Sequence, residues 1–280
     1  MSSNMENVRP SPIAGSWYTS SAQALQLEIR SYLAAAKLQP IEGEVIGLIA
    51  PHAGYRYSGP TAGYAYRAVL GKEVDVVAVF SPFHDFTDER LLTTSHSAYQ
   101  TPLGAVPVAD DMMAVFQKQI EGKGLRAQEI AFDREHSLEI QLPFLQIALG
   151  KEFLLFPLMV RTYEMDEIEV VAQAAANVFK EKKMLLIAST DLSHFYDQKT
   201  ACTLDEEMLK RIAAFSPEQV LEAERKGIAF ACGAGAVAAI LRTAQLLGGT
   251  RVQVLHHSTS GAESGDYSSV VGYGAAIIER

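Results

Sequence analysis

Short apolar runs that alternate with helical patterns constrain the fold of this chain more than any other feature. Residues 45–50, 74–80, 153–160 and 184–189 are such runs. Runs of this kind are typical of strands that are buried on both faces, as in a sheet covered by helices. Strands alternating with helices indicate an α/β layer structure. The sequence therefore predicts an α/β fold with a mostly parallel or mixed central sheet covered by helices.

The remaining elements are expected around these four runs. The Thr, Ser and Val content of residues 91–109 suggests an antiparallel excursion, and residues 251–256 and 269–278 are expected to form final strands joined by a loop at 258–265. Pro60 lies just ahead of one helical pattern, and Pro143 must kink or divide another. The expected helices span about 21–37, 61–70, 110–122, 137–149, 166–180, 201–215, 217–226 and 233–247.

The size and composition of the chain fit one globular domain. A chain of 280 residues, 48% hydrophobic and 20% charged, can bury most of its apolar surface without disulfides. No repeat, low-complexity tract or linker rich in Pro, Gly or Ser divides the sequence. We therefore expect a single domain over residues 1–280.

Charge and hydropathy argue against several classes of protein. The formal net charge is −9 with scattered basic residues, whereas a nucleic-acid-binding protein normally has a basic face. Residues 1–12 lack the apolar core of a signal peptide, and the longest uncharged apolar stretch, 228–241, is too short to span a membrane. Because Cys202 and Cys232 are the two cysteines, no disulfide framework is expected. We expect a cytoplasmic protein that binds neither nucleic acid nor membrane.

Three histidines follow predicted strands directly. His52 follows the run at 45–50, His84 the run at 74–80 and His194 the run at 184–189. Open α/β sheets bind ligands outside the carboxyl ends of their strands, so the three imidazoles could reach one ion. Three protein ligands with open positions are typical of a catalytic metal site. A single histidine here would more often brace a loop, but three of seven in one topological place favour a shared metal site.

Further polar residues are expected near this site. Asp191 could orient a ligating imidazole, exchange a proton with bound water, or cap the following turn or helix. Cys232 stands at the predicted start of a buried helix, where a lowered pKa would make the thiolate a ligand or nucleophile; the alternative is a small buried apolar residue. His136 could supply a proton to the pocket or hold a helix start. No role is assigned to His96, His256 or His257.

Two glycine-containing segments resemble nucleotide-binding motifs only by letter. Residues 233–238, G-A-G-A-V-A, come late in the chain with no acidic residue at the expected distance. Close packing of a helix explains these glycines. Residues 260–265, S-G-A-E-S-G, lack the Lys-Ser/Thr ending of a Walker loop and are interpreted as a flexible pocket rim.

Seven sequence blocks occur in one order along nearly the whole chain. They are R-P-S-P-I-A-G-S-W-Y near the start, A-P-H-A-G-Y-R-Y-S-G-P at 50–60, S-P-F-H at 81–84, D-R-E-H-S-L-E-I-Q-L-P-F at 133–144, S-T-D-L-S-H at 189–194, A-C-G at 231–233 and G-D-Y-S-S-V-V-G-Y at 265–273. Together they resemble the Memo family, whose bacterial and archaeal members are commonly labelled AmmeMemoRadiSam system protein B.

The resemblance implies a single α/β domain related to the class III extradiol ring-cleavage dioxygenases, which use non-haem iron(II). It implies that His52, His84 and His194 are the metal-pocket histidines, with Cys232 as the pocket cysteine and Asp191 as a pocket aspartate. It also implies iron or copper binding. The animal member binds phosphotyrosine peptides through the same pocket, and the name of the system suggests radical-SAM and AMMECR-type proteins as partners.

Functions from different classes follow from these observations. The first is a metal-dependent oxidoreductase of unknown substrate, in which His136 or Asp191 moves protons. The second is a non-catalytic module that keeps the metal pocket to bind a peptide or protein partner. A hydrolase that uses metal-bound water ranks third. Related dioxygenases use two histidines and a carboxylate, whereas a third histidine with a nearby thiol leaves copper or zinc as alternatives to iron(II).

Overall fold

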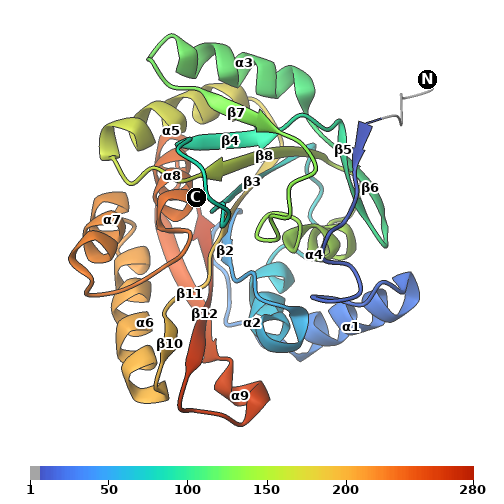
Figure 1. Ribbon diagram of the computed structural model, residues 1–280, viewed down its shortest axis with the longest axis vertical. Helices are drawn as coiled ribbons and strands as arrows, with labels where there is room; N and C mark the ends of the chain where they lie inside the picture. Colours follow the sequence, from blue (N-terminus) through green and yellow to red (C-terminus); the bar gives the residue numbers. More distant parts are fainter. Residues whose placement is uncertain (1–6) are drawn as a thin grey trace.

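The four apolar runs form the centre of the main sheet. A computed structural model describes residues 7–280, so the prediction for residues 1–12 falls partly outside the described residues. The four central strands, in their order across the sheet, are β2 (Val45–Ala50), β9 (Met184–Ser189), β3 (Val76–Ser81) and β8 (Leu154–Val160). They run parallel to one another, and helices cover both faces of the sheet (Figure 1).

Shorter and antiparallel strands extend this sheet on both sides. Beyond β2, β12 (Val270–Glu279) runs antiparallel and also pairs with β11 (Arg251–Thr259) and β10 (His194–Tyr196). Beyond β8, β4 (Leu91–Thr94) runs antiparallel, and β7 (Ala127–Ile130) pairs with it. The predicted α/β class with a mixed central sheet is therefore confirmed.

A second, three-stranded sheet lies at one side of the molecule. The hairpin of β5 (Ala98–Thr101) and β6 (Gly104–Pro107) is joined by β1 (Val8–Arg9), which pairs parallel with β5. The prediction of an antiparallel excursion at residues 91–109 is confirmed by β4 and by this hairpin. The N-terminal strand β1 is thereby attached to the body of the protein (Figure 1).

The helices form two groups, and each group encloses one hydrophobic core against one face of the sheet. In Figure 1 the two blue helices, α1 and α2, lie on one side of the sheet, and the orange α7 and α8 lie on the other. The first group is α1 (Ala22–Ala35), α2 (Tyr55–Arg67) and α4 (Gln141–Ala148). The second group is α3 (Asp110–Glu121), α5 (Met165–Phe179), α6 (Gln198–Ala213), α7 (Pro217–Lys226) and α8 (Ala234–Leu246).

Three details differ from the sequence prediction. Pro60 lies inside α2 rather than ahead of it, because this helix already begins at Tyr55. The helical pattern predicted at 137–149 is divided ahead of Pro143, into a turn at 137–140 and α4, so that Pro143 lies in the first turn of α4, where a missing N–H breaks no helical hydrogen bond. The predicted loop at 258–265 contains a one-turn helix, α9 (Gly261–Ser264).

The glycines that begin α8 serve close packing, as predicted. A Cβ on Gly233 would lie 2.4 Å from the carbonyl oxygen of Ser189, and one on Gly235 would lie 2.4 Å from that of Thr162. Helix α8 therefore begins against the ends of β9 and β8, which places Cys232 beside the carboxyl edge of the sheet. Within residues 7–280, no helix combines the length and apolar character needed to cross a membrane.

Candidate metal centre

Three adjacent strands deliver the three predicted histidines to one edge of the sheet. Strand β9 lies between β2 and β3, and all three run parallel. His52 follows the end of β2, His84 follows the end of β3, and His194 begins β10 after the loop that leaves β9. Sheet topology rather than chain spacing therefore brings residues so far apart in sequence to the same edge.

His52, His84 and His136 form a tight group of potential metal ligands. One ligand atom from each residue lies within 4.8 Å of those from the other two. The ring centroids are 5.3 Å apart for His52 and His84, 5.4 Å for His52 and His136, and 4.6 Å for His84 and His136. This group could hold a metal ion. His136 therefore joins the cluster, whereas His194 lies outside that tight group but near enough for its charge to act on His52.

The hydrogen bonds of Ser189 fix the proton position on His52. The Ser189 hydroxyl donates to the carbonyl oxygen of Ser137 at 2.6 Å and accepts from Nε2 of Gln141 at 2.7 Å. Its oxygen must therefore accept the bond from Nδ1 of His52, at 3.0 Å. The Nδ1 of His52 carries the proton, and Nε2 presents a lone pair.

The other two predicted ligands are fixed in the same form. Nδ1 of His84 donates to the Glu135 carboxylate at 3.0 Å, and Nδ1 of His194 donates to the carbonyl oxygen of Leu192 at 2.8 Å. A carboxylate and a carbonyl only accept hydrogen bonds, so Nε2 carries the lone pair in both neutral rings. Metal-bound histidines are typically oriented by such a bond at the other ring nitrogen.

Glu135 is a buried carboxylate of the centre that the sequence analysis did not assign. It accepts hydrogen bonds from the backbone amides of His136 at 2.9 Å, Ser137 at 2.7 Å and His84 at 2.6 Å. Burial alone would raise its pKa, but the bond from His84, the nearby His84 and His136 charges and the Ser137 amide lower the pKa well below the usual glutamate range. Glu135 therefore stays ionised and fixes both the backbone and the ring of His84. Its position directly before His136 was the available sequence signal.

Burial keeps most imidazoles of the centre neutral. It lowers the pKa of His52 well below the ordinary value, and His136 and His84 add to the effect. It also lowers the pKa of His136 to about 4 and lowers that of His194. For His84, burial acts in the same direction, but the bond and charge of Glu135 outweigh it and raise the pKa. Neutral imidazole is the form that binds a metal.

Cys232 lies directly against His52. Its Sγ is 3.1 Å from Nε2 of His52, and the Asp191 amide donates to the same sulfur at 3.3 Å. Burial raises the pKa of the thiol, and the neighbouring Asp191 raises it further. The expected lowering by a helix N-terminus is therefore outweighed, and in the metal-free chain Cys232 is a thiol that donates to Nε2 of His52. The sulfur nevertheless stands beside the nitrogen that would face a metal.

Asp191 braces the loop that carries His52. Its Oδ1 accepts a hydrogen bond from the His52 backbone amide at 2.7 Å. Burial raises the pKa of Asp191 to about 7, against the lowering effect of that amide. The carboxyl group therefore orients the His52 backbone rather than an imidazole ring, and its pKa suits proton exchange near neutral pH.

The centre is closed at His52 and open at His84. His52 is 2% exposed, whereas the side chain of His84 is 37% exposed. Trp17, to which the sequence analysis gave no role, covers His136 with its ring centroid 4.1 Å away. A separate cavity of about 940 Å³, between the β5–β6 hairpin and the segment linking α4 to β8, contains none of the six predicted site residues.

The remaining histidines have partners away from the centre. Nδ1 of His96 contacts the side chain of Asn7 at 2.8 Å. His256 contacts Thr61 of α2, whereas the adjacent His257 pairs with Asp205 of α6. The two neighbours on β11 thus face opposite sides of the sheet, as alternation along a strand requires.

Comparisons with known proteins cover almost the whole chain. The family model described as Memo-like protein matches residues 9–277. A MEMO1 family protein of Nitrosopumilus maritimus (strain SCM1) is 32% identical over 273 residues, which is 96% of this chain and 98% of that protein. MEMO1 family proteins of Methanosarcina acetivorans and Thermotoga neapolitana are 32% and 33% identical, with 97% of this chain and 99% of each relative covered.

Proposed function

Since the chain belongs to the Memo family, we propose that it is a metal-dependent oxidoreductase of unknown substrate, with non-haem iron(II) held at the carboxyl edge of the sheet. Copper or zinc are the alternative metals, because imidazole binds all three and a thiol stands close by. The proposal rests on one observation, the three Nδ1 hydrogen bonds that leave Nε2 of His52, His84 and His194 as lone pairs.

We propose His52, His84 and His194 as the ligands, with Cys232 beside them. His52 and His84 also belong to the tight histidine group. His136 has no comparably close bond at its ring, since its Nδ1 lies 3.5 Å from Glu135. Its lowered pKa makes it a neutral proton acceptor at pH 7, so we assign it proton transfer.

The chain's own residues would handle protons around the ion. A bound iron(II) would supply redox and oxygen chemistry. The neutral His136 would take up a proton, and Asp191, whose burial raises its pKa to about 7, would hold or release one. Glu135 would keep His84 in place, and the exposed side of His84 would admit the substrate.

Metal content tests this proposal. We would purify the wild type without oxygen or chelators and compare it with His52→Ala, His84→Ala, His194→Ala and His136→Ala. We expect about one metal per chain in the wild type, none in the first three variants, and retention in His136→Ala. If His194→Ala keeps the metal and His136→Ala loses it, the third ligand is His136 rather than His194. A wild type that takes up neither iron, copper nor zinc would contradict the proposal.

A non-catalytic binding module is the second candidate. Phe86, two residues after His84, and Phe195, directly after His194, are 88% and 75% exposed, so they offer apolar contacts to a peptide or protein partner. Radical-SAM and AMMECR-type proteins would be such partners. Binding of either protein that is lost in Phe86→Ser and Phe195→Ser, but kept in His52→Ala, would favour this role. Both cysteines are free, which fits the cytoplasmic location that we also propose.

A further inference from the structure

Arg9 of strand β1 is a buried charged side chain. It is 1% exposed, and its guanidinium forms a two-pronged contact with Asp133, at 3.0 Å from Nε and 2.7 Å from Nη2. Nη1 donates to the Glu139 carboxylate at 2.6 Å. A buried arginine with this many partners acts as a fixed fork, because its planar donors match carboxylates two at a time.

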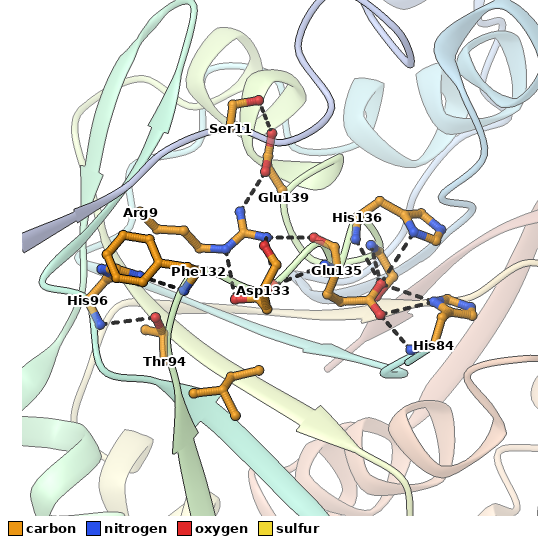
Figure 2. Close-up of polar contacts among 12 residues, drawn as sticks. Arg9, Ser11, His84, Thr94, His96, Phe132, Asp133, Glu135, His136 and Glu139 are labelled. Carbon is orange, nitrogen blue, oxygen red and sulfur yellow. Dashed lines mark hydrogen bonds and ion pairs between the residues drawn. The ribbon is translucent and has the colours of Figure 1, made fainter. Parts of the chain in front are cut away.

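The partners of Arg9 lie in the loop that carries Glu135 and His136 to the metal centre. This β7–α4 loop comprises residues 131–140 and includes Glu135 and His136. Nη2 of Arg9 donates to the carbonyl oxygen of Glu135 at 2.8 Å, while the Glu135 carboxylate holds the ring and the backbone amide of His84. Figure 2 shows this chain of contacts running from Arg9 through Asp133 and Glu135 to His84.

Other residues of the N-terminal segment contact the same loop. Ser11 and Tyr18 both donate to Oε1 of Glu139, so the carboxylate held by Arg9 is also held from two more positions (Figure 2 draws the Ser11 bond). Trp17 stacks on His136. Residues 9–18 thus contact the β7–α4 loop at Asp133, Glu135, His136 and Glu139.

The loop has a backbone conformation that needs such support. Phe132 has φ of 54°, a left-handed conformation that is costly for a bulky residue and is kept only where its surroundings hold it. Its amide donates to Nε2 of His96 at 3.1 Å, and Nδ1 of His96 contacts Asn7. The first described residues of the chain therefore hold both Phe132 and Asp133.

We propose that Arg9 is a positioning residue for the metal centre, which sets the orientation of His84 by holding the β7–α4 loop and its Glu135. The inference rests on the proposed function for its consequence in metal binding. Without the fork of Arg9, the Asp133 and Glu139 carboxylates repel each other in a buried space. The loop then moves, and the Glu135 carboxylate no longer meets Nδ1 of His84 at one fixed place.

Histidine tautomers in the metal-free protein give a readout that needs no metal. We would label Arg9→Met, Arg9→Lys and the wild type with ¹⁵N-histidine and record long-range ¹H–¹⁵N correlation spectra. The spectra are recorded at a pH high enough to leave the His84 ring neutral, since Glu135 raises its pKa; there the wild type should have His84 protonated at Nδ1 alone. Arg9→Met should give a mixture of the two neutral forms, and Arg9→Lys should recover only part of the wild-type signal, because an ammonium lacks the planar fork.

Cobalt(II) binding, followed by its visible absorption, measures the consequence at the site. Loss of an outer partner of a metal-ligating histidine typically weakens metal binding about 10- to 100-fold, and we expect this range for Arg9→Met with altered absorption bands. The matched control is Arg251→Met, which removes an arginine paired with Glu279 at the other end of β12. It should leave the His84 signals and the cobalt affinity unchanged.

The outcomes separate the two proposals. A folded Arg9→Met protein with wild-type His84 signals and cobalt affinity would overturn the role of Arg9. A wild type that binds no cobalt would count against the proposed function, while the spectra would still decide whether Arg9 positions His84. If thermal unfolding shows that Arg9→Met does not fold, Asp133→Asn, which keeps the shape but removes the charge, takes its place with the same expected direction.

Discussion

The two edges of the central sheet both bury charge, but they differ in what remains available to a ligand. At the amino edge, Glu279 accepts hydrogen bonds from the amides of Glu42 and Gly43 and from Arg251. At the carboxyl edge, Glu135 is satisfied in a similar way by three amides. There, however, it also turns a histidine ring so that Nε2 is left without a proton.

This difference distinguishes a carboxylate that only stabilises the fold from one that also orients a potential metal ligand. A fully satisfied carboxylate such as Glu279 closes a turn and offers nothing further. Glu135 and Ser189 use their hydrogen bonds to hold Nδ1 of His84 and His52, so each of them leaves a lone pair on Nε2 of the ring that it holds. Buried charge occurs at both edges and does not distinguish them. The histidine Nε2 lone pairs at the carboxyl edge do.

The largest effect should come from exchanging the two carboxylates for amides. Glu135→Gln and Glu279→Gln should each lower the free energy of unfolding by about 1–3 kcal/mol, because a buried acceptor of amide bonds is replaced in part by a donor. Only Glu135→Gln should also weaken metal binding, by about 10- to 100-fold. Urea unfolding and metal titration measure the two effects. Equal metal affinities in the two variants would remove the distinction between the edges.

The next largest effect should be a difference in the pH range over which groups at the two edges change the free energy of unfolding. Burial lowers the pKa of His136 to about 4 from an unfolded value of 6.5, so between these values the unfolded chain binds more protons and stability falls as the pH falls. The slope from this one group reaches at most about 1.4 kcal/mol per pH unit. Glu279, whose pKa the Gly43 amide and Arg251 lower against the effect of burial, loses stability only as the pH falls below 4.5.

The measurement is urea unfolding of the metal-free protein from pH 7 to pH 4, with His136→Gln beside the wild type. The variant should show a shallower fall between pH 6.5 and pH 4. His84 acts with the opposite sign, since Glu135 outweighs burial and raises its pKa, but it is present in both proteins. Parallel curves for the two proteins would show that folding does not lower the pKa of His136.

A smaller effect is expected from the hydroxyl that fixes His52. Ser189→Ala removes the acceptor of the Nδ1 bond and leaves Nε2 of Gln141 with the Pro51 carbonyl as its remaining partner. We expect a loss of about 1 kcal/mol in stability and metal binding weaker by about tenfold. Ser258→Ala, which removes a hydroxyl contact with Thr61, is the control and should leave metal binding intact. Unchanged metal affinity in Ser189→Ala would mean that His52 is held by its packing alone.

The smallest effect should come from the cation at the amino edge. Arg251 is 46% exposed, and an ion pair open to solvent contributes about 0–1 kcal/mol. Arg251→Met should therefore change the unfolding free energy little and the metal affinity not at all. A loss of metal binding in this variant would show that the two edges are coupled through the length of β12.

The fold was largely predictable because its signals are local. The four runs that became β2, β3, β8 and β9 are apolar on both faces, and that pattern survives any arrangement of the rest of the chain. The prolines were harder. Pro143 sits harmlessly in the first turn of α4 because residues 137–140 form a separate turn before it, and nothing in the local sequence sets that boundary.

The histidines of the candidate site that follow strands were predictable, whereas the residues that surround them were not. His52, His84 and His194 could be named because each follows a strand, and the carboxyl ends of parallel strands share an edge. His136 was named as a proton donor or as a support for a helix start, and Glu135, Ser189 and Trp17 were given no role. His136, Glu135 and Trp17 reach the centre through a loop and an N-terminal segment, whose positions relative to the sheet depend on packing. Ser189 ends β9, but its partners His52 and Gln141 come from other parts of the chain.

The sequence by itself determined the layers of the fold and the strand ends that carry the histidines, since both follow from local hydrophobic pattern. Only the tertiary structure decided which groups orient these rings, that Cys232 is a thiol with a raised pKa rather than a helix-stabilised thiolate, and that Arg9 holds the loop of Glu135. Those outcomes depend on burial and on hydrogen bonds between residues such as Arg9 and Glu135, 126 positions apart. Such partners meet only when the whole chain has folded.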